Sequence, residues 1–283
     1  MEVQEAEWSL SDNQMAYRIR VIPKRKRRIM RSGNAMKTPY GLEIIENCLT
    51  CPVKQDGLFC DLSPRALEGL DAISTSATYP KGAILFVEGQ EARGVFVICN
   101  GKVKLSASSA DGKSLILRIA DAGEVVGLPG TISGKPYELT AEALEPVQAS
   151  FIHRDAFLTF LQRHGEVAVR VAEVLSDIYY ATYQEVRYLG LSGSAVEKLA
   201  RFLLDLTTDN GKVSAGGDGV PRISLTLTHE EIAQMIGSSR ETVTRLFGHL
   251  RRKHLVEVHG STLIITNKAG LEQIFQPSPS IDR

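Results

Sequence analysis

The sequence predicts an α+β fold in which an N-terminal β-roll, a long helix and a C-terminal winged helix-turn-helix follow one another. Three observations carry this prediction. Short β-type segments separated by glycine turns fill residues 77–153, a helical period runs through 165–188, and two short helices flank a glycine between 228 and 250. We therefore expect a cysteine segment and roll over 41–164, a long helix over 165–190 and a C-terminal domain over 191–283.

The composition is that of a globular chain. Its 283 residues are 43% hydrophobic and 23% charged, which suits two domains of ordinary size. No apolar run is long enough to cross a bilayer and no signal-peptide core opens the chain, so we expect a cytoplasmic protein without a membrane partner. The formal net charge is zero, but residues 1–35 are basic, and the rest of the chain has 25 Lys and Arg against 29 Asp and Glu. This mildly acidic body argues against broad, nonspecific coating of DNA.

Residues 1–40 show no sustained apolar period, and we interpret them as a disordered basic tail. The basic run Lys24–Arg28 would suit an arm that contacts nucleic acid. The favoured alternative is a translated leader, with Met36 as the true start.

Residues 228–250 carry the signals of two helices joined by a tight turn. Thr228 is a candidate N-cap, and Glu231 three residues later completes a capping box. Gly237 ends the first helix because glycine accepts the left-handed conformation of a helix stop. Ser238 or Ser239 then caps the second helix. A predicted hairpin over 255–265, with a turn at His259-Gly260, follows and makes the unit a winged helix.

The second helix has polar side chains of both signs on the face opposite its apolar residues. In a helix-turn-helix the N-terminal part of this helix enters the major groove of DNA. Arginine can donate twice to guanine there, and glutamate can accept from cytosine. A surface helix with an ion pair between Glu241 and Arg245 is the alternative. The candidate DNA-binding residues are Thr228, Ser239, Arg240, Glu241, Thr244 and Arg245.

The predicted roll consists of short, evenly spaced strands between two short helices, near 61–75 and 154–163. Glycines at the turns, such as Asn100-Gly101 and Asp111-Gly112, separate the strands, which is typical of a compact roll or barrel. The predicted strands are Ala83–Val87, Gly94–Cys99, Lys102–Ser108, Leu115–Ile119, Ala141–Leu144 and Ala149–Ile152.

The long helix carries an apolar stripe with alternating spacings of four and three residues. This spacing indicates a coiled-coil seam between two copies of the chain, and hence a homodimer. The alternative is a face that packs within one chain. The stripe consists of Val167, Val171, Val174, Ile178 and Ala181. A hinge near Leu191-Ser-Gly-Ser and a helix over 195–206 are expected next, and the glycine-rich residues 210–219 then form a loop or hairpin turn.

This order of elements resembles the CRP/FNR superfamily of bacterial transcription regulators over about residues 45–270. The roll glycines and Ser239-Arg-Glu-Thr-Val-Thr-Arg245 carry the resemblance. It implies a cyclic-nucleotide-binding-like roll as sensor, a homodimer, an inverted-repeat operator in double-stranded DNA, and RNA polymerase as a partner. Arg240, Glu241 and Arg245 resemble the base-reading residues of the superfamily, which implies a TGA core in each half-site.

The superfamily's cyclic-nucleotide site uses a glutamate for the ribose and an Arg-Ser pair for the phosphate. At the matching positions this sequence has Leu128 and the pair Tyr137-Glu138. A carboxylate close to a phosphate is repelled by it. No cyclic AMP is therefore expected as effector.

Three of the four cysteines, Cys48, Cys51 and Cys60, lie before the roll. Thiolates at such spacing ligate an iron–sulfur centre or zinc, and free or redox-active thiols are a third interpretation. The segment is similar to the N-terminal ligand segment of FNR-type regulators, which hold an oxygen-labile [4Fe–4S] cluster. That group's fourth cysteine corresponds to Ser150 here, so Cys99 is the candidate fourth metal ligand. Cys99 as a small buried strand residue is the alternative, with Asp61 or an external ligand completing the site.

The sequence thus favours a transcription regulator that senses oxygen or redox state. The alternative within this class is a regulator with another small-molecule effector and structural cysteines, either free or bound to zinc. A cysteine-dependent enzyme is least favoured, because no paired carboxylates, phosphate loop or histidine pair accompany the thiols.

Overall fold

The computed structural model describes residues 40–42, 44–45, 48, 51, 58–60, 62–191, 194–208, 213–215, 221–224, 227–259 and 262–274. The predicted tail before Tyr40, Asp61 and most of the predicted hinge and glycine-rich loop lie outside these residues. Within them, no helix has both the length and the apolar character that crossing a membrane requires.

The N-terminal half is a roll of two four-stranded sheets, flanked by helices α1 (Pro64–Ile73), α2 (Leu128–Ser133) and α3 (Arg154–Arg163). Its strands are β1 (Ser74–Tyr79), β2 (Ile84–Phe86), β3 (Gly94–Asn100), β4 (Val103–Ser108), β5 (Ser114–Ala120), β6 (Val125–Val126), β7 (Thr140–Ala143) and β8 (Val147–His153). One sheet has the order β1-β8-β3-β6 and the other β2-β7-β4-β5. The predicted α+β class with an N-terminal roll is confirmed.

The six predicted strands each overlap an observed strand, whereas β1, β6 and α2 were not predicted. The β1 sequence Ser-Thr-Ser-Ala-Thr-Tyr lacks apolar alternation, and its antiparallel pairing with β8 supplies the order. The glycine at the β3–β4 turn is required by the geometry: Gly101 has φ +86°, and a Cβ there would lie 2.4 Å from the carbonyl oxygen of Pro146.

Two apolar cores fill the roll. The first, called the helix-side core, joins the cysteine segment to α1, β3 and α3, and its buried members include Phe59, Leu67, Val97 and Phe157. The second is made mainly by residues of both sheets, such as Phe86 and Phe96, together with Tyr137 from the segment between α2 and β7. The cysteine segment therefore belongs to the same packed unit as the helices that follow the roll.

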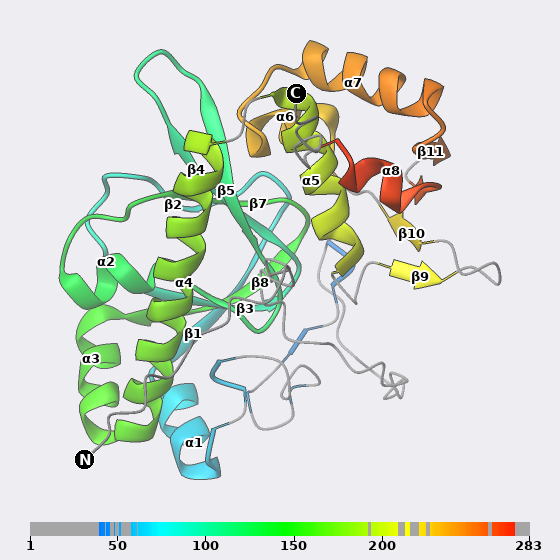
Figure 1. Ribbon diagram of the computed structural model, residues 1–283. Coiled ribbons are helices and arrows are strands. Elements are labelled where there is room, and N and C mark those ends of the chain that lie inside the picture. Colours follow the sequence, from blue (N-terminus) through cyan, green and yellow to red (C-terminus); the bar gives the residue numbers. More distant parts are fainter. Residues whose placement is uncertain are drawn as a thin grey trace, which may run out of the picture.

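The long helix α4 (Gly165–Leu191) runs alongside the roll (Figure 1). Val167 and Val171 are buried within a single chain, and Val174 packs against the same helix-side core. This part of the predicted dimer seam is therefore wrong. The first half of the stripe packs against the chain's own roll, because the apolar side chains of the helix-side core would otherwise be exposed to water. Other apolar side chains of α4 are exposed, including Val169, Tyr179, Tyr183 and Val186.

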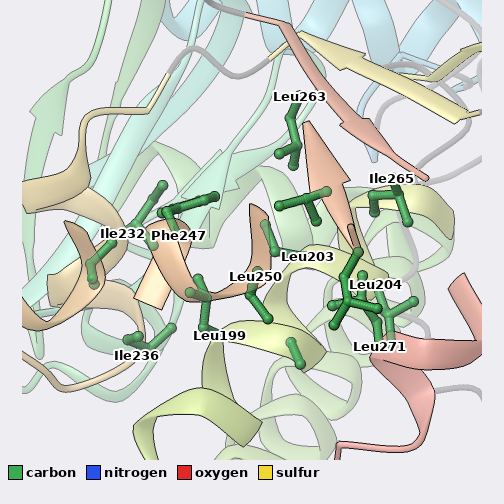
Figure 2. Close-up of a cluster of buried hydrophobic side chains, with 14 of the residues drawn as sticks. Leu199, Leu203, Leu204, Ile232, Ile236, Phe247, Leu250, Leu263, Ile265 and Leu271 are labelled. Carbon is green, nitrogen blue, oxygen red and sulfur yellow. The ribbon is translucent and has the colours of Figure 1, made fainter. Parts of the chain in front are cut away.

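The C-terminal half is a winged helix-turn-helix. Its elements are α5 (Ala195–Thr208), β9 (Val213–Ala215), β10 (Pro221–Ser224), α6 (His229–Met235), α7 (Arg240–Arg252), β11 (Val256–His259), β12 (Thr262–Ile265) and α8 (Lys268–Glu272). The strands form a sheet in the order β11-β12-β10-β9. Figure 2 shows the core that α5, α6, α7, β12 and α8 build together, with Leu199, Ile232, Phe247 and Leu263 among its buried side chains.

The two halves also touch away from α4. The β4–β5 hairpin projects from the roll towards α6, and residues of α6 contact β5 (Figure 1). A Cβ on Gly237, in the turn after α6, would lie 3.9 Å from Leu115 Cδ1. The helix-turn-helix therefore lies against the roll as well as against its own wing.

Candidate nucleic-acid interface and cysteine cavity

The first helix of the helix-turn-helix begins with the predicted capping box. The Thr228 hydroxyl accepts from the Glu231 amide at 3.2 Å, and Glu231 Oε2 accepts from the Thr228 amide at 2.7 Å. Gly237 has φ +61°, and the Ser238 amide donates to the carbonyl of Ala233 at 2.9 Å. This closure of the last turn fixes the angle at which the next helix leaves.

The second helix is capped by Ser239, whose Oγ accepts from the Thr242 amide at 3.2 Å. Opposite the buried Val243, Phe247 and Leu250, the side chains of Arg240, Glu241, Thr244 and Arg245 are exposed. Of the six candidate DNA-binding residues, Thr228 and Ser239 thus serve as caps, and the other four form one exposed polar surface on α7.

His229 supports that surface from α6. Its ring stacks on Phe247 with centroids 5.0 Å apart, and its Nδ1 lies 3.0 Å from the hydroxyl of Thr244. The Thr244 hydroxyl also donates to the carbonyl of Arg240 at 2.9 Å. These contacts tie α6 to the first turns of α7. No sequence signal pointed to His229 beyond its place next to the cap.

The charges on α7 suit an approach to DNA. Hydrogen bonds from its own amide and from Ser239, together with the nearby Arg240 charge, lower the pKa of Glu241, so this carboxylate is ionised at neutral pH. The ion pair that would join Glu241 to Arg245 is absent from the part of the chain that the structure describes. Arg251, Arg252 and Lys253 are exposed at the far end of the helix.

All four cysteines line one cavity of about 250 Å³ between the cysteine segment, α1 and the β1-β8-β3 face of the roll. The other lining residues are Ile45, Phe59, Asp71, Ser74, Ser76, Val97, Ile98, Gly123 and Ser150. Among the described residues, no three His, Cys, Asp or Glu side chains meet closely enough to hold a single metal ion. The thiols therefore surround a space rather than converge on a point.

Strand pairing brings Cys99 next to Ser150. The β3–β8 register pairs Val97 with Ser150 and Ile98 with Ala149, and it then shifts so that Asn100 faces Gln148. Cys99 is the extra residue of this irregularity, which is a common means of re-aiming a side chain. Its Sγ lies 3.5 Å from Ser150 Oγ. The candidate fourth ligand is thus one strand away from the serine.

The environment favours the protonated form of Cys48, Cys60 and Cys99 in the metal-free chain. Burial, and then the neighbouring cysteines and Asp71, raise the pKa of Cys48 to about 11. A hydrogen bond with Cys51 and burial raise the pKa of Cys60, and burial raises that of Cys99. A thiol is reactive as its thiolate, so free cysteines here are poor nucleophiles at neutral pH.

Two domains of known families match this chain. Residues 197–274 match the Crp-like helix-turn-helix domain and residues 77–164 match the cyclic nucleotide-binding domain. The global nitrogen regulator of Synechococcus elongatus is 30% identical over 199 residues, which cover 70% of this chain and 88% of that one. The chain belongs to the CRP/FNR family of transcription regulators. Its helix-turn-helix is accordingly a DNA-binding unit.

Other similar proteins carry names of different regulator types. The CRP-like cAMP-activated global regulator of Mycobacterium tuberculosis is 26% identical over 76% of this chain and 94% of that one. The fumarate and nitrate reduction regulatory protein of Vibrio cholerae is 27% identical over 81% and 90%. FixK2 from Bradyrhizobium japonicum shares the fold, with a TM-score of 0.60 at 22% identity, over 73% of this chain and 99% of that one. Membership of the CRP/FNR family alone therefore leaves the effector open.

Leu128 and Tyr137, the residues that the resemblance matches to the cyclic-nucleotide site, are both buried in this CRP/FNR roll. Leu128 is buried at the start of α2. Tyr137 is buried with its ring stacked on Phe86, centroids 4.0 Å apart, and its hydroxyl donates to the carbonyl of Gly94 at 2.6 Å. Neither residue offers the positive charge that a cyclic phosphate needs. These residues do not fit a cyclic nucleotide.

Four polar residues at or next to the cysteine cavity were not predicted from the sequence. Asp71, Ser74 and Ser76 line it, and Gln148 donates from its Nε2 to Ser76 Oγ at 3.1 Å. Their relation to the cysteines depends on the pairing of β1 with β8 and on the placement of α1. No local sequence signal carries that information.

Proposed function

We propose that this CRP/FNR regulator senses oxygen or redox state in the cytoplasm through a [4Fe–4S] cluster held by Cys48, Cys51, Cys60 and Cys99. The observation that carries the proposal is the single cavity that all four cysteines line. When bound, such a cluster supplies iron that is labile to oxygen. Four thiols around a space suit it better than one zinc ion, which needs its sulfur ligands about 2.3 Å from one point.

Cys99 is a suitable fourth ligand because it lies one strand away from Ser150, the position at which the FNR-type group has its fourth cysteine. The thiol and the Ser150 hydroxyl are 3.5 Å apart and point into the same cavity. A ligand can therefore move from β8 to β3 with little change in the position of its sulfur. Asp71, whose carboxylate also lines the cavity, is the competing fourth ligand.

The cysteine segment is packed so that its position bears on α4. Phe59, next to Cys60, is buried with its ring edge-on to Phe157, centroids 6.0 Å apart. The same core contains Val167 and Val171 of α4. Release of Cys60 would free Phe59 to move, and a tightly packed core transmits such a change to its neighbours. The two states would then differ in the packing of α4.

The exposed face of α4 is the proposed dimer seam in place of the first half of the predicted stripe, whereas Ile178 and Ala181 of its second half are half-buried and exposed, respectively. Apolar residues there are between 53% and 74% exposed. They lie on a line with alternating spacings of three and four, typical of a coiled coil between two copies. The line runs through Val169, Ala172, Tyr179, Tyr183 and Val186, with the polar Ser176 at the position between Ala172 and Tyr179.

In the proposed dimer, Arg240, Glu241 and Arg245 of each copy read one half-site of an inverted repeat with a TGA core. Half-sites about one helical turn apart follow from the two-fold symmetry. RNA polymerase is the proposed partner at promoters. Each base pair presents its own pattern of hydrogen-bond donors and acceptors in the major groove. This surface can match such a pattern because the two arginines donate and Glu241 accepts.

A ligand exchange tests the proposal. Anaerobically purified or reconstituted protein should be brown and lose its visible absorption in air. Cys99→Ser should abolish the colour, and the double variant Cys99→Ser/Ser150→Cys should restore it, with Ser150→Cys alone as the control. Colour retained in Cys99→Ser would show that Cys99 is a core residue and would favour Asp71 as the fourth ligand. Colourless reconstituted protein that binds one zinc would refute redox sensing and leave the DNA-binding assignment intact.

A further inference from the structure

A single buried side chain holds the backbone just before the first cysteine. Gln148 lies on β8 and is 1% exposed. Its Oε1 accepts from the amide of Ile45 at 2.8 Å, and its Nε2 donates to the carbonyl of the same residue at 2.7 Å. Two hydrogen bonds in opposite directions to one residue reproduce the exchange between paired strands.

The hydrogen-bonding capacity of Gln148 is filled only when the segment is docked. A glutamine amide has two N–H donors and one carbonyl oxygen. The second N–H donates to Ser76 Oγ at 3.1 Å on the neighbouring strand β1. If Ile45 left, a donor and an acceptor would be buried without partners, which is unfavourable. The segment and the strand therefore stabilise each other.

The clamp lies at the cysteine cavity. Ile45 is three residues before Cys48, and Gln148 is two residues before Ser150, which neighbours Cys99. Ile45 and Ser76 line the same cavity as the thiols. The contact thus joins the part of the chain that carries Cys48 to the part that carries Cys99.

We infer that Gln148 is a positioning residue that sets where the cysteine segment docks on the roll and so brings Cys48 to face Cys99. Its effect on metal binding rests on the proposed function, whereas the clamp itself does not. Ligands held in place before binding form a site with less loss of conformational freedom. Without the clamp, the thiols would assemble a cluster more slowly and lose it sooner.

Hydrogen exchange of the metal-free protein tests the clamp directly. In Gln148→Leu, the peptide containing Ile45 should exchange about tenfold faster, the effect of losing one ordinary hydrogen bond. Gln148→Glu should be intermediate, because a carboxylate still accepts from the Ile45 amide but cannot donate to its carbonyl. Gln162→Leu, at an exposed position of α3, should leave this peptide unchanged.

Unchanged exchange at Ile45 in a folded Gln148→Leu variant would overturn the inference. If Gln148→Leu does not fold, the comparison of Gln148→Glu with wild type decides in the same way. The second readout is the half-life of visible absorption in air, expected to be several-fold shorter in Gln148→Leu. Equal half-lives would overturn the role towards the cluster. A colourless wild type would refute the proposed function, while exchange at Ile45 would still decide the clamp.

Discussion

Replacing Ser239 by alanine separates helix capping from DNA contact. Its hydroxyl accepts from the Thr242 amide at 3.2 Å and donates to Thr242 Oγ1 at 3.1 Å, so it is satisfied within α7. Losing an N-cap side chain costs about 1 kcal/mol. In a protein with about 5 kcal/mol of stability or more, nearly all molecules remain folded after that loss. We therefore expect operator affinity to change by less than about twofold.

Urea unfolding followed by circular dichroism measures the stability change, and fluorescence anisotropy with a labelled operator duplex measures affinity. Ser239→Asp is the matched control for stability, since aspartate also caps helices and should restore it. A fall of about tenfold or more in affinity of Ser239→Ala, equal to about 1.4 kcal/mol, with unchanged stability would refute the reasoning. That result would place the hydroxyl on DNA.

Three further outcomes are expected. Arg245→Ala should cost about 1–3 kcal/mol of operator binding and relax the preference at one base pair; an equal loss on random DNA would mean a phosphate contact. Tyr183→Glu should yield monomers in ultracentrifugation, because a charge would be buried on each side of the proposed seam; an intact dimer would move the seam elsewhere. The unfolding free energy of metal-free protein should fall as the pH rises from about 9 to about 11, because the raised pKa of Cys48 lets the unfolded thiol ionise first. Cys48→Ser should make this decline shallower, and identical curves would contradict the assignment.

Local signals predicted the DNA-binding half well. The capping box at Thr228, the stop at Gly237 and the apolar spacing of Val243, Phe247 and Leu250 are each set by residues within about two turns of one another. The structure has all of them. Such features depend on backbone geometry that neighbouring residues determine, so a sequence contains them in full.

Contacts between residues that are far apart in the sequence could not be predicted from it. The stripe on α4 indicated an apolar face but not whether a second copy or the same chain packs against it. Val171 packs against the roll of its own chain. Cys99 and Ser150 are 51 positions apart and become neighbours only through the β3–β8 register. Gln148 reads as an ordinary polar strand residue, although the structure buries it against Ile45.

The most direct test of the account measures operator affinity and visible absorption in one anaerobic sample as air is admitted. The cysteine cavity is proposed to control α4, and through it the DNA-binding dimer. Affinity should therefore fall in parallel with the absorption, by about 5- to 150-fold, the usual range of coupling between two sites. Cys99→Ser should show the low affinity from the start. Loss of the absorption with unchanged operator affinity would contradict the account.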